Sequence, residues 1–85
     1  MYLIWRGRYI VPTKTATKEM VSIGINLEKV LNILETGYDD PKAKRKKGTI
    51  VKCSTLKGRY IKVVAVESYQ YSTDTEVWLI THVGD

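Results

Sequence analysis

The chain lacks most of the features that would mark a membrane protein, a disulfide scaffold or a metalloprotein. It has one cysteine and one histidine, so an internal disulfide is excluded and a Cys/His metal site is disfavoured. No apolar run approaches the roughly 20 residues that span a bilayer. The apolar start before Arg6 is too short for the core of a secretory signal. We expect a cytoplasmic protein with no metal, no cofactor and no membrane partner.

The chain also lacks the length for a second domain. A chain of 85 residues buries only about two-thirds of its unfolded surface. We therefore expect residues 1–85 to form a single domain with one modest core. The composition is 44% hydrophobic and 27% charged, which is ordinary for a globular domain and argues against disorder.

Acidic residues are missing from one long stretch, between Pro41 and Val66. This stretch holds nine basic residues, five of them within residues 42–47. The rest of the chain has five basic and nine acidic residues, a net charge of −4. Positive charge gathered in this way attracts nucleic acid or another anionic surface. The nucleic-acid-binding residues that we predict are Lys42, Lys44, Arg45, Lys46, Lys47, Lys52, Lys57 and Arg59.

The apolar pattern predicts a strand, two helices and then three strands. The segment YLIWRGRYIV is typical of a strand, with Gly7 as a bulge or the tip of a tight hairpin. Thr13 is expected to cap a short helix that ends at Gly24, and Asn26 a second that ends at a left-handed Gly37. The three strand segments are TIVKCST, RYIKVVAVESYQY and TEVWLITHV.

These elements predict an α+β fold: an N-terminal strand, two short helices, then a three-stranded antiparallel meander with the helices packed on one sheet face. The register of the last hairpin decides which side chains share a face. A three-residue loop pairs Tyr71 with Thr75, whereas a two-residue loop would mix polar and apolar side chains on both faces. With the three-residue loop, the face away from the helices carries Tyr60, Lys62, Val64, Trp78, Ile80 and His82.

Three residues on that predicted face are candidates for catalysis. Histidine is the side chain that titrates near neutrality, so His82 is the natural general acid or base. Lys62 could stabilise charge that develops on a phosphate, and Tyr60 could stack on a base or position a 2′-hydroxyl. The alternative for His82 is a partly exposed strand histidine with no orienting partner.

A family resemblance rests on residues 15–25, TATKEMVSIGI. They fit the frame H-A-x-x-R-M-x-x-R-x-I at Ala16, Met20, Gly24 and Ile25. With the second helix that closes at Gly37 and the ending LITHV, the chain resembles the RelE/ParE-like toxin superfamily of small ribonuclease folds. More narrowly, it resembles uncharacterised families of that fold whose first helix carries this motif.

The resemblance implies a concave sheet face that binds RNA and is bordered by basic residues. It also implies an antitoxin-like protein partner. The motif's histidine and two arginines are replaced here by Thr15, Glu19 and Ile23. No role of those three side chains therefore carries over to this chain.

The function that we expect is RNA binding through residues 42–62, without catalysis. Lysine outnumbers arginine in the basic run, so we expect phosphate contacts rather than base reading. Two other functions stay open: a toxin–antitoxin-type ribonuclease that uses His82, and a protein–protein interaction module. The basic run could also be only a solvated loop.

Overall fold

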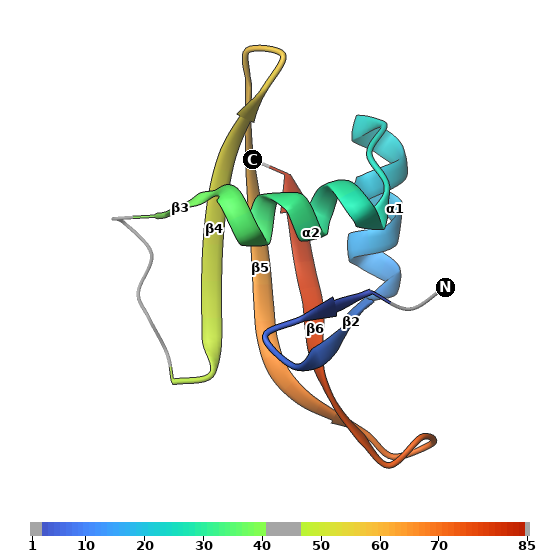
Figure 1. Cartoon of the computed structure of the whole chain (residues 1–85). Helices are drawn as coiled ribbons and strands as arrows, with labels where there is room; N and C mark the ends of the chain where they lie inside the picture. Colours follow the sequence, from blue (N-terminus) through green and yellow to red (C-terminus); the bar gives the residue numbers. More distant parts are fainter. Residues whose placement is uncertain (1–2, 41–46, 85) are drawn as a thin grey trace.

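Residues 3–40 and 47–84 contain eight elements, and six of them join one sheet. The computed structural model, drawn in Figure 1, describes residues 3–40 and 47–84. No helix in these residues is both long and apolar enough to cross a membrane. In chain order the elements are β1 (Ile4–Trp5), β2 (Arg8–Pro12), α1 (Lys14–Ile23), α2 (Leu27–Thr36), β3 (Tyr38–Asp39), β4 (Thr49–Leu56), β5 (Arg59–Gln70) and β6 (Thr75–Gly84).

Both helices begin at the predicted capping residues. The Thr13 hydroxyl oxygen accepts from the Ala16 N–H at 3.0 Å, and the Asn26 side-chain oxygen accepts from the Lys29 N–H at 2.9 Å. Each bond satisfies an N–H group that a helix leaves unpaired in its first turn. The end of α1 is also as predicted, because Gly24 has a left-handed φ of 77°.

Gly37 is not the left-handed stop that we predicted. Its φ is −70°, which most residues can adopt. A Cβ at this position would lie 2.7 Å from the backbone oxygen of Cys53 and closer still to that of Ile33. Glycine is needed here because β4 passes close to the end of α2, not because the backbone takes a special rotation.

The sheet is six-stranded and mixed, so our prediction of a three-stranded antiparallel meander is wrong. Its strand order is β1-β2-β6-β5-β4-β3. The N-terminal segment is a hairpin that turns at Arg6 and Gly7, with φ values of 50° and 78°, as a type I′ turn requires. β2 then pairs in parallel with β6, and β3 pairs with β4 at the other edge. The broader α+β class holds.

The extra pairings join segments that lie far apart in the sequence. β2 covers the edge of β6, from Tyr9 opposite Val77 to Pro12 opposite Ile80; without it, these backbone groups would be unpaired. β3 is only two residues long, too short to show the period-two pattern of a strand. The alternation of apolar residues therefore predicts where the long strands lie in the sequence, but not which strands pair with them in the sheet.

The last hairpin has neither register that we considered from the sequence. Gln70 pairs with Thr75, so four residues form the loop. A β-bulge then leaves Thr81 without an opposite residue, and beyond it Val64 pairs with His82. The three-residue loop predicted this last pair correctly but misplaced the residues nearer the loop.

The bulge changes which side chains face the core. Trp78 and Ile80, which we predicted on the face away from the helices, are 5% and 0% exposed and belong to the core. This prediction is wrong because one extra residue reverses the facing of every residue on its far side. Ile80 is instead opposite Ala65, which is also buried.

The core lies between the helices and one face of the sheet. Figure 1 shows α2 crossing β4, β5 and β6, with α1 standing beside β6. Both helices contribute to a single apolar cluster with the strands. Its helical members are Ala16, Met20, Val30, Ile33 and Leu34, and its members from β5 are Ile61, Val63 and Ala65.

The burial of side chains along α2 gives a test of which face of this helix packs against the sheet. Leu34 is 1% exposed, whereas Leu31 is only partly buried. Leu34→Ala should lower the free energy of unfolding by about 2–5 kcal/mol, because it removes buried surface and leaves a cavity. Leu31→Ala should cost less. Chemical denaturation measures both; equal losses, or a negligible loss at Leu34, would contradict the assigned face.

Candidate nucleic-acid interface

One face of the sheet has no described helix across β4 and β5 (Figure 1). On β5, Ile61, Val63 and Ala65 point into the core, so the residues between them point the other way. Residues paired across neighbouring strands share a face. We call this surface the open face. It comprises Tyr60, Lys62, Val64 and Val66 of β5, with Val51, Cys53, Leu79 and His82 as cross-strand partners and Tyr38 opposite Cys53.

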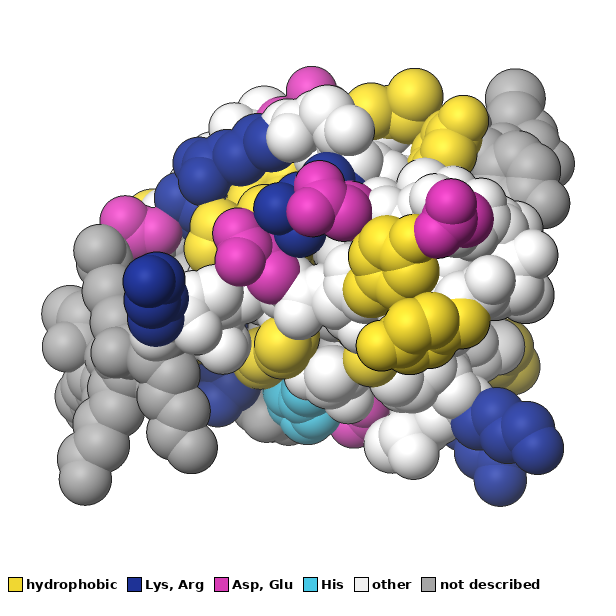
Figure 2. All heavy atoms as spheres, turned by 90° about the horizontal axis from the view of Figure 1, so that it is seen from below, with side chains coloured by type: hydrophobic (Ala, Val, Ile, Leu, Met, Phe, Trp, Pro, Cys, Tyr) yellow, Lys and Arg dark blue, Asp and Glu magenta, His cyan; other side chains and the backbone are white. Residues whose placement is uncertain are grey.

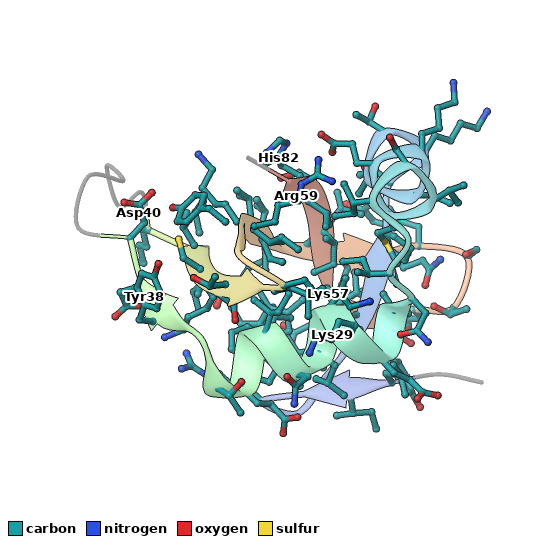
Figure 3. The ribbon with its side chains drawn as sticks, turned by 90° about the horizontal axis from the view of Figure 1, so that it is seen from above. Lys29, Tyr38, Asp40, Lys57, Arg59 and His82 are labelled. Carbon is teal, nitrogen blue, oxygen red and sulfur yellow. The ribbon has the colours of Figure 1, made fainter. Side chains whose placement is uncertain are left out.

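The three residues proposed for catalysis all lie on the open face, but Tyr60 and His82 contact different parts of the protein. Lys62 is opposite Cys53 on one side and Gly84 on the other. Tyr60 contacts Cys53, toward the edge that carries β3, whereas His82 lies toward α1. Figure 3 shows His82 on the side of the sheet away from α2.

Tyr60 is held by the buried thiol of Cys53. Its hydroxyl oxygen lies 2.9 Å from Sγ, and Cys53 has no exposed surface. This hydrogen bond is the main reason that the pKa of Tyr60 is raised above the ordinary value of a tyrosine, and desolvation adds to it. Tyr60 is therefore a neutral phenol at physiological pH. It offers an aromatic ring, 41% exposed, rather than a base.

Tyr38 is a second aromatic side chain of the open face. It begins β3 opposite Cys53 and is 53% exposed. Tyr38 and Tyr60 thus both border the same buried thiol. The sequence does not single out Tyr38, because a two-residue strand has no recognisable pattern. Exposed aromatic rings on strands are the platforms on which single-stranded nucleic acids stack their bases.

His82 is oriented by Glu19 of α1. His82 Nδ1 lies 3.0 Å from Glu19 Oε2, and the backbone N–H of Val83 donates to Glu19 Oε1 at 3.2 Å. The side chains of His82 and Glu19 are 34% and 28% exposed. A carboxylate at one ring nitrogen orients the imidazole and fixes its tautomer. His82 thus has the orienting partner that the sequence did not reveal.

The predicted phosphate-binding residues fall into three groups. Lys42, Lys44, Arg45 and Lys46 lie outside the described residues. Lys52 forms an ion pair with Asp39, because its Nζ lies 2.8 Å from Asp39 Oδ1. Lys47, Lys57 and Arg59 are exposed. Within residues 3–40 and 47–84, no carboxylate lies at ion-pair distance from Lys57, Arg59 or Lys62.

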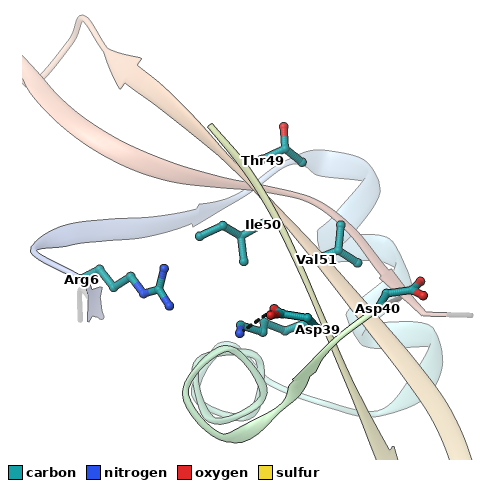
Figure 4. Close-up of a pocket in the computed structure, with 7 residues that line it drawn as sticks. Arg6, Asp39, Asp40, Thr49, Ile50 and Val51 are labelled. Atoms are coloured by element: carbon teal, nitrogen blue, oxygen red, sulfur yellow. Dashed lines mark hydrogen bonds and ion pairs between the residues drawn. The ribbon is translucent and has the colours of Figure 1, made fainter. Parts of the chain in front are cut away.

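A hollow of about 320 Å³ lies between the β1–β2 turn, β3 and β4. It is a weaker candidate for binding an anion than the open face. Figure 4 shows the ion pair of Lys52 and Asp39 within it, with Arg6 facing them. Among the described residues, two cations and two carboxylates line this hollow, so their charges balance. Its lining is Arg6, Asp39, Asp40, Thr49, Ile50, Val51 and Lys52.

The end of the molecule that bears the β5–β6 loop is also unsuited to a phosphate. Arg8 lies 3.8 Å from Glu67 and 3.6 Å from Glu76, and its guanidinium also stacks over Trp78. Figure 2 shows this end, where acidic and basic side chains intermingle beside hydrophobic ones. The guanidinium of Arg8 already lies near the carboxylates of Glu67 and Glu76, and these two negative charges would repel an added phosphate.

Metal chemistry finds no support in the described part of the chain, where no three His, Cys, Asp or Glu side chains gather. Comparisons of the chain with protein-family models, with curated proteins and with solved structures found no match. The resemblance to the RelE/ParE-like superfamily therefore stays a prediction.

The contact between Tyr60 and Cys53 gives a pH prediction. The raised pKa means that Tyr60 should ionise at a higher pH than an ordinary tyrosine. Cys53→Ala removes the hydrogen bond that is the main cause, so Tyr60 should then ionise at a lower pH than in the parent. Tyrosinate absorbance against pH measures this, with Tyr60→Phe to assign the signal. An unchanged titration in Cys53→Ala would refute the contact.

Proposed function

We propose that the protein binds single-stranded RNA on its open face, with little reading of base sequence. The observation that carries this proposal is the combination of exposed aromatic rings and an unmatched cation on an uncovered sheet face. Tyr38 and Tyr60 supply the rings, and Lys62 supplies the charge.

Stacking accounts for a preference for single strands. Bases in a duplex are already stacked on each other, whereas the bases of a single strand can turn outward onto aromatic side chains. Each such stack contributes about 1–3 kcal/mol and tolerates any base. The partly buried side chains of Val51, Val64 and Leu79 provide an apolar floor beside the two tyrosines.

Phosphate contacts account for the role of the acid-free stretch. Lys62 lies on the open face, Arg59 begins β5 and Lys57 lies in the turn between β4 and β5. None of the three has a carboxylate at ion-pair distance in the described residues. Unmatched cations neutralise phosphates and release the counterions that surround a nucleic acid. Only one of these three is an arginine, so the set favours point contacts to the backbone over bidentate contacts to bases.

The salt dependence of binding tests the proposal. If about four phosphates are neutralised, the logarithm of affinity for a single-stranded RNA should fall with the logarithm of salt concentration at a slope near −3. Lys62→Gln should reduce the size of that slope by about 0.7, because one phosphate contact is lost. Fluorescence anisotropy with a labelled oligonucleotide measures both.

The matched control is Lys29→Gln on α2, which removes the same charge from the other side of the sheet (Figure 3). It should leave the slope nearly unchanged. Equal effects of the two substitutions would mean that only net charge matters and would contradict binding at the open face. No binding at any salt concentration would refute the proposed function and leave the protein–protein module standing.

A second candidate function, RNA cleavage, is favoured by the contact between Glu19 and His82. In this reaction the 2′-oxygen of a ribose attacks the adjacent phosphorus, and His82 Nε2 takes its proton. The 5′-oxygen leaves the phosphorus and takes a proton from water, which gives a cyclic phosphate and a 5′-hydroxyl. The carboxylate of Glu19, 3.0 Å from Nδ1, would stabilise the imidazolium that forms.

Two substitutions separate cleavage from binding. His82→Ala should slow cleavage by about 10²–10⁴-fold, the size of a general acid–base contribution, and leave RNA affinity nearly unchanged. Glu19→Gln should also slow it and alter its pH profile, because the amide cannot balance the imidazolium charge. Single-turnover cleavage of a labelled RNA by the pure protein is the assay. Absence of cleavage, or cleavage that survives His82→Ala, would exclude this second function.

A further inference from the structure

A second hollow, of about 380 Å³, lies between α1 and the ends of β5 and β6. Helix α1 forms one wall, the beginning of β5 another, and the end of β6 the floor. The space equals that of about a dozen water molecules, enough for a phosphate group with part of its hydration shell. The lining residues are Lys18, Glu19, Ser22, Ile23, Arg59, Val83 and Gly84.

Two unmatched cations face this hollow from different elements. Lys18 comes from α1 and Arg59 from β5, and both are exposed. Neither has a carboxylate at ion-pair distance among residues 3–40 and 47–84. Among the described residues of the lining, Glu19 is the one acid, and it is already engaged by His82 and by the N–H of Val83. This part of the lining therefore holds two cations and one carboxylate, whereas the described charges of the hollow beside β3 balance.

The chemistry of the lining suits a phosphate group. An arginine side chain donates two parallel hydrogen bonds to phosphate oxygens, and a lysine adds a point charge. Ser22, exposed on α1, adds a hydroxyl that can donate a third hydrogen bond. Two cations that share one hollow repel each other, and a bound anion removes that repulsion.

The hollow lies next to Lys62 and His82 of the open face. Gly84 lines the hollow and pairs directly with Lys62 of β5. A Cβ on Gly84 would lie 3.9 Å from the imidazole of His82 and 4.0 Å from Glu19 Oε2. Glu19 itself lines the hollow, so the His82–Glu19 pair lies at its edge. A strand that contacts Lys62 and runs toward α1 would bring its next phosphates to this hollow.

We propose that this hollow is an anion site for one phosphate group, held by Lys18 and Arg59. The inference rests on the proposed function in one respect, which is that the phosphate belongs to an RNA strand bound on the open face. The site adds to that function a fixed anchor at the α1 end of the strand. It also places this phosphate beside His82.

Inorganic phosphate is the first probe, because it reports on the hollow without RNA. Titration of the full chain, followed by amide chemical shifts in NMR, should move the signals of Ser22, Val83 and Gly84 more than those of α2. Lys18→Gln and Arg59→Gln should each weaken phosphate binding by about tenfold or more, since each removes a charged hydrogen-bond donor. Lys29→Gln should leave it unchanged. Both tested side chains are exposed, and an unchanged amide spectrum confirms that the variants fold.

A single-stranded RNA is the second probe, and it separates the two proposals. Lys18→Gln and Arg59→Gln should each weaken RNA binding and reduce the salt slope by about 0.7. RNA binding that neither substitution affects, with no phosphate shifts in the hollow, would overturn this inference and leave the open-face function intact. Phosphate shifts that both substitutions abolish support the anion site. In that case, failure of RNA to bind counts against the proposed function alone.

Discussion

The incomplete edge of β6 is the constraint on which the rest of the structure depends. β2 pairs with β6 only as far as Ile80, and the N–H of Thr13 continues the ladder with a bond of 3.0 Å to the Ile80 oxygen. Beyond that point the chain turns into α1, so no described strand lies on this side of β6, although β5 still pairs with its other side. Glu19 takes over there, and its carboxylate accepts from the N–H of Val83. A helix side chain thus replaces a missing strand, as a buried edge requires.

The same carboxylate also orients the histidine of the open face. A carboxylate that caps Val83 must lie next to the side chain that precedes it in β6, and this side chain is His82. Its second oxygen is then within 3.0 Å of the imidazole. The contact between Glu19 and His82 is thus a consequence of how the sheet ends. Sequence analysis missed it because neither residue is close to the other along the chain, and because a glutamate in the middle of a helix usually faces solvent.

The bulge at Thr81 decides whether His82 is available at all. Ile80 and His82 are two residues apart, so in an unbroken strand they would point to the same side. Ile80 has no exposed surface, and an unbroken β6 would therefore turn His82 into the core. The extra residue lets Ile80 pack while His82 faces outward. β-Bulges often re-aim a side chain in this way next to functional sites.

Local chemistry could be predicted from the sequence, and pairing between distant segments could not. The caps at Thr13 and Asn26 depend on residues three positions away, and both were found. The parallel pairing of β2 with β6 depends on the whole tertiary structure. Periodicity locates a strand but does not say which edge it will join. The position of the bulge is equally hidden, because Thr81 looks like any other β-branched strand residue.

The alternation of side chains along β4 and β5 places the basic residues of the acid-free stretch on different faces of the sheet, which composition alone does not show. Lys52 is opposite Val63, a core residue, so its side chain emerges on the helix side of the sheet, where Asp39 matches it. Lys62 is opposite Cys53 and emerges on the open face, where no described carboxylate reaches it. The basic residues of this stretch are thus of two kinds. Lys52 forms an ion pair within the protein, whereas Lys62 is left to contact a ligand. Lys62 lies between Cys53, beside the tyrosines, and Gly84, beside the His82–Glu19 pair, which is why we place the nucleic acid there and not along the whole basic stretch.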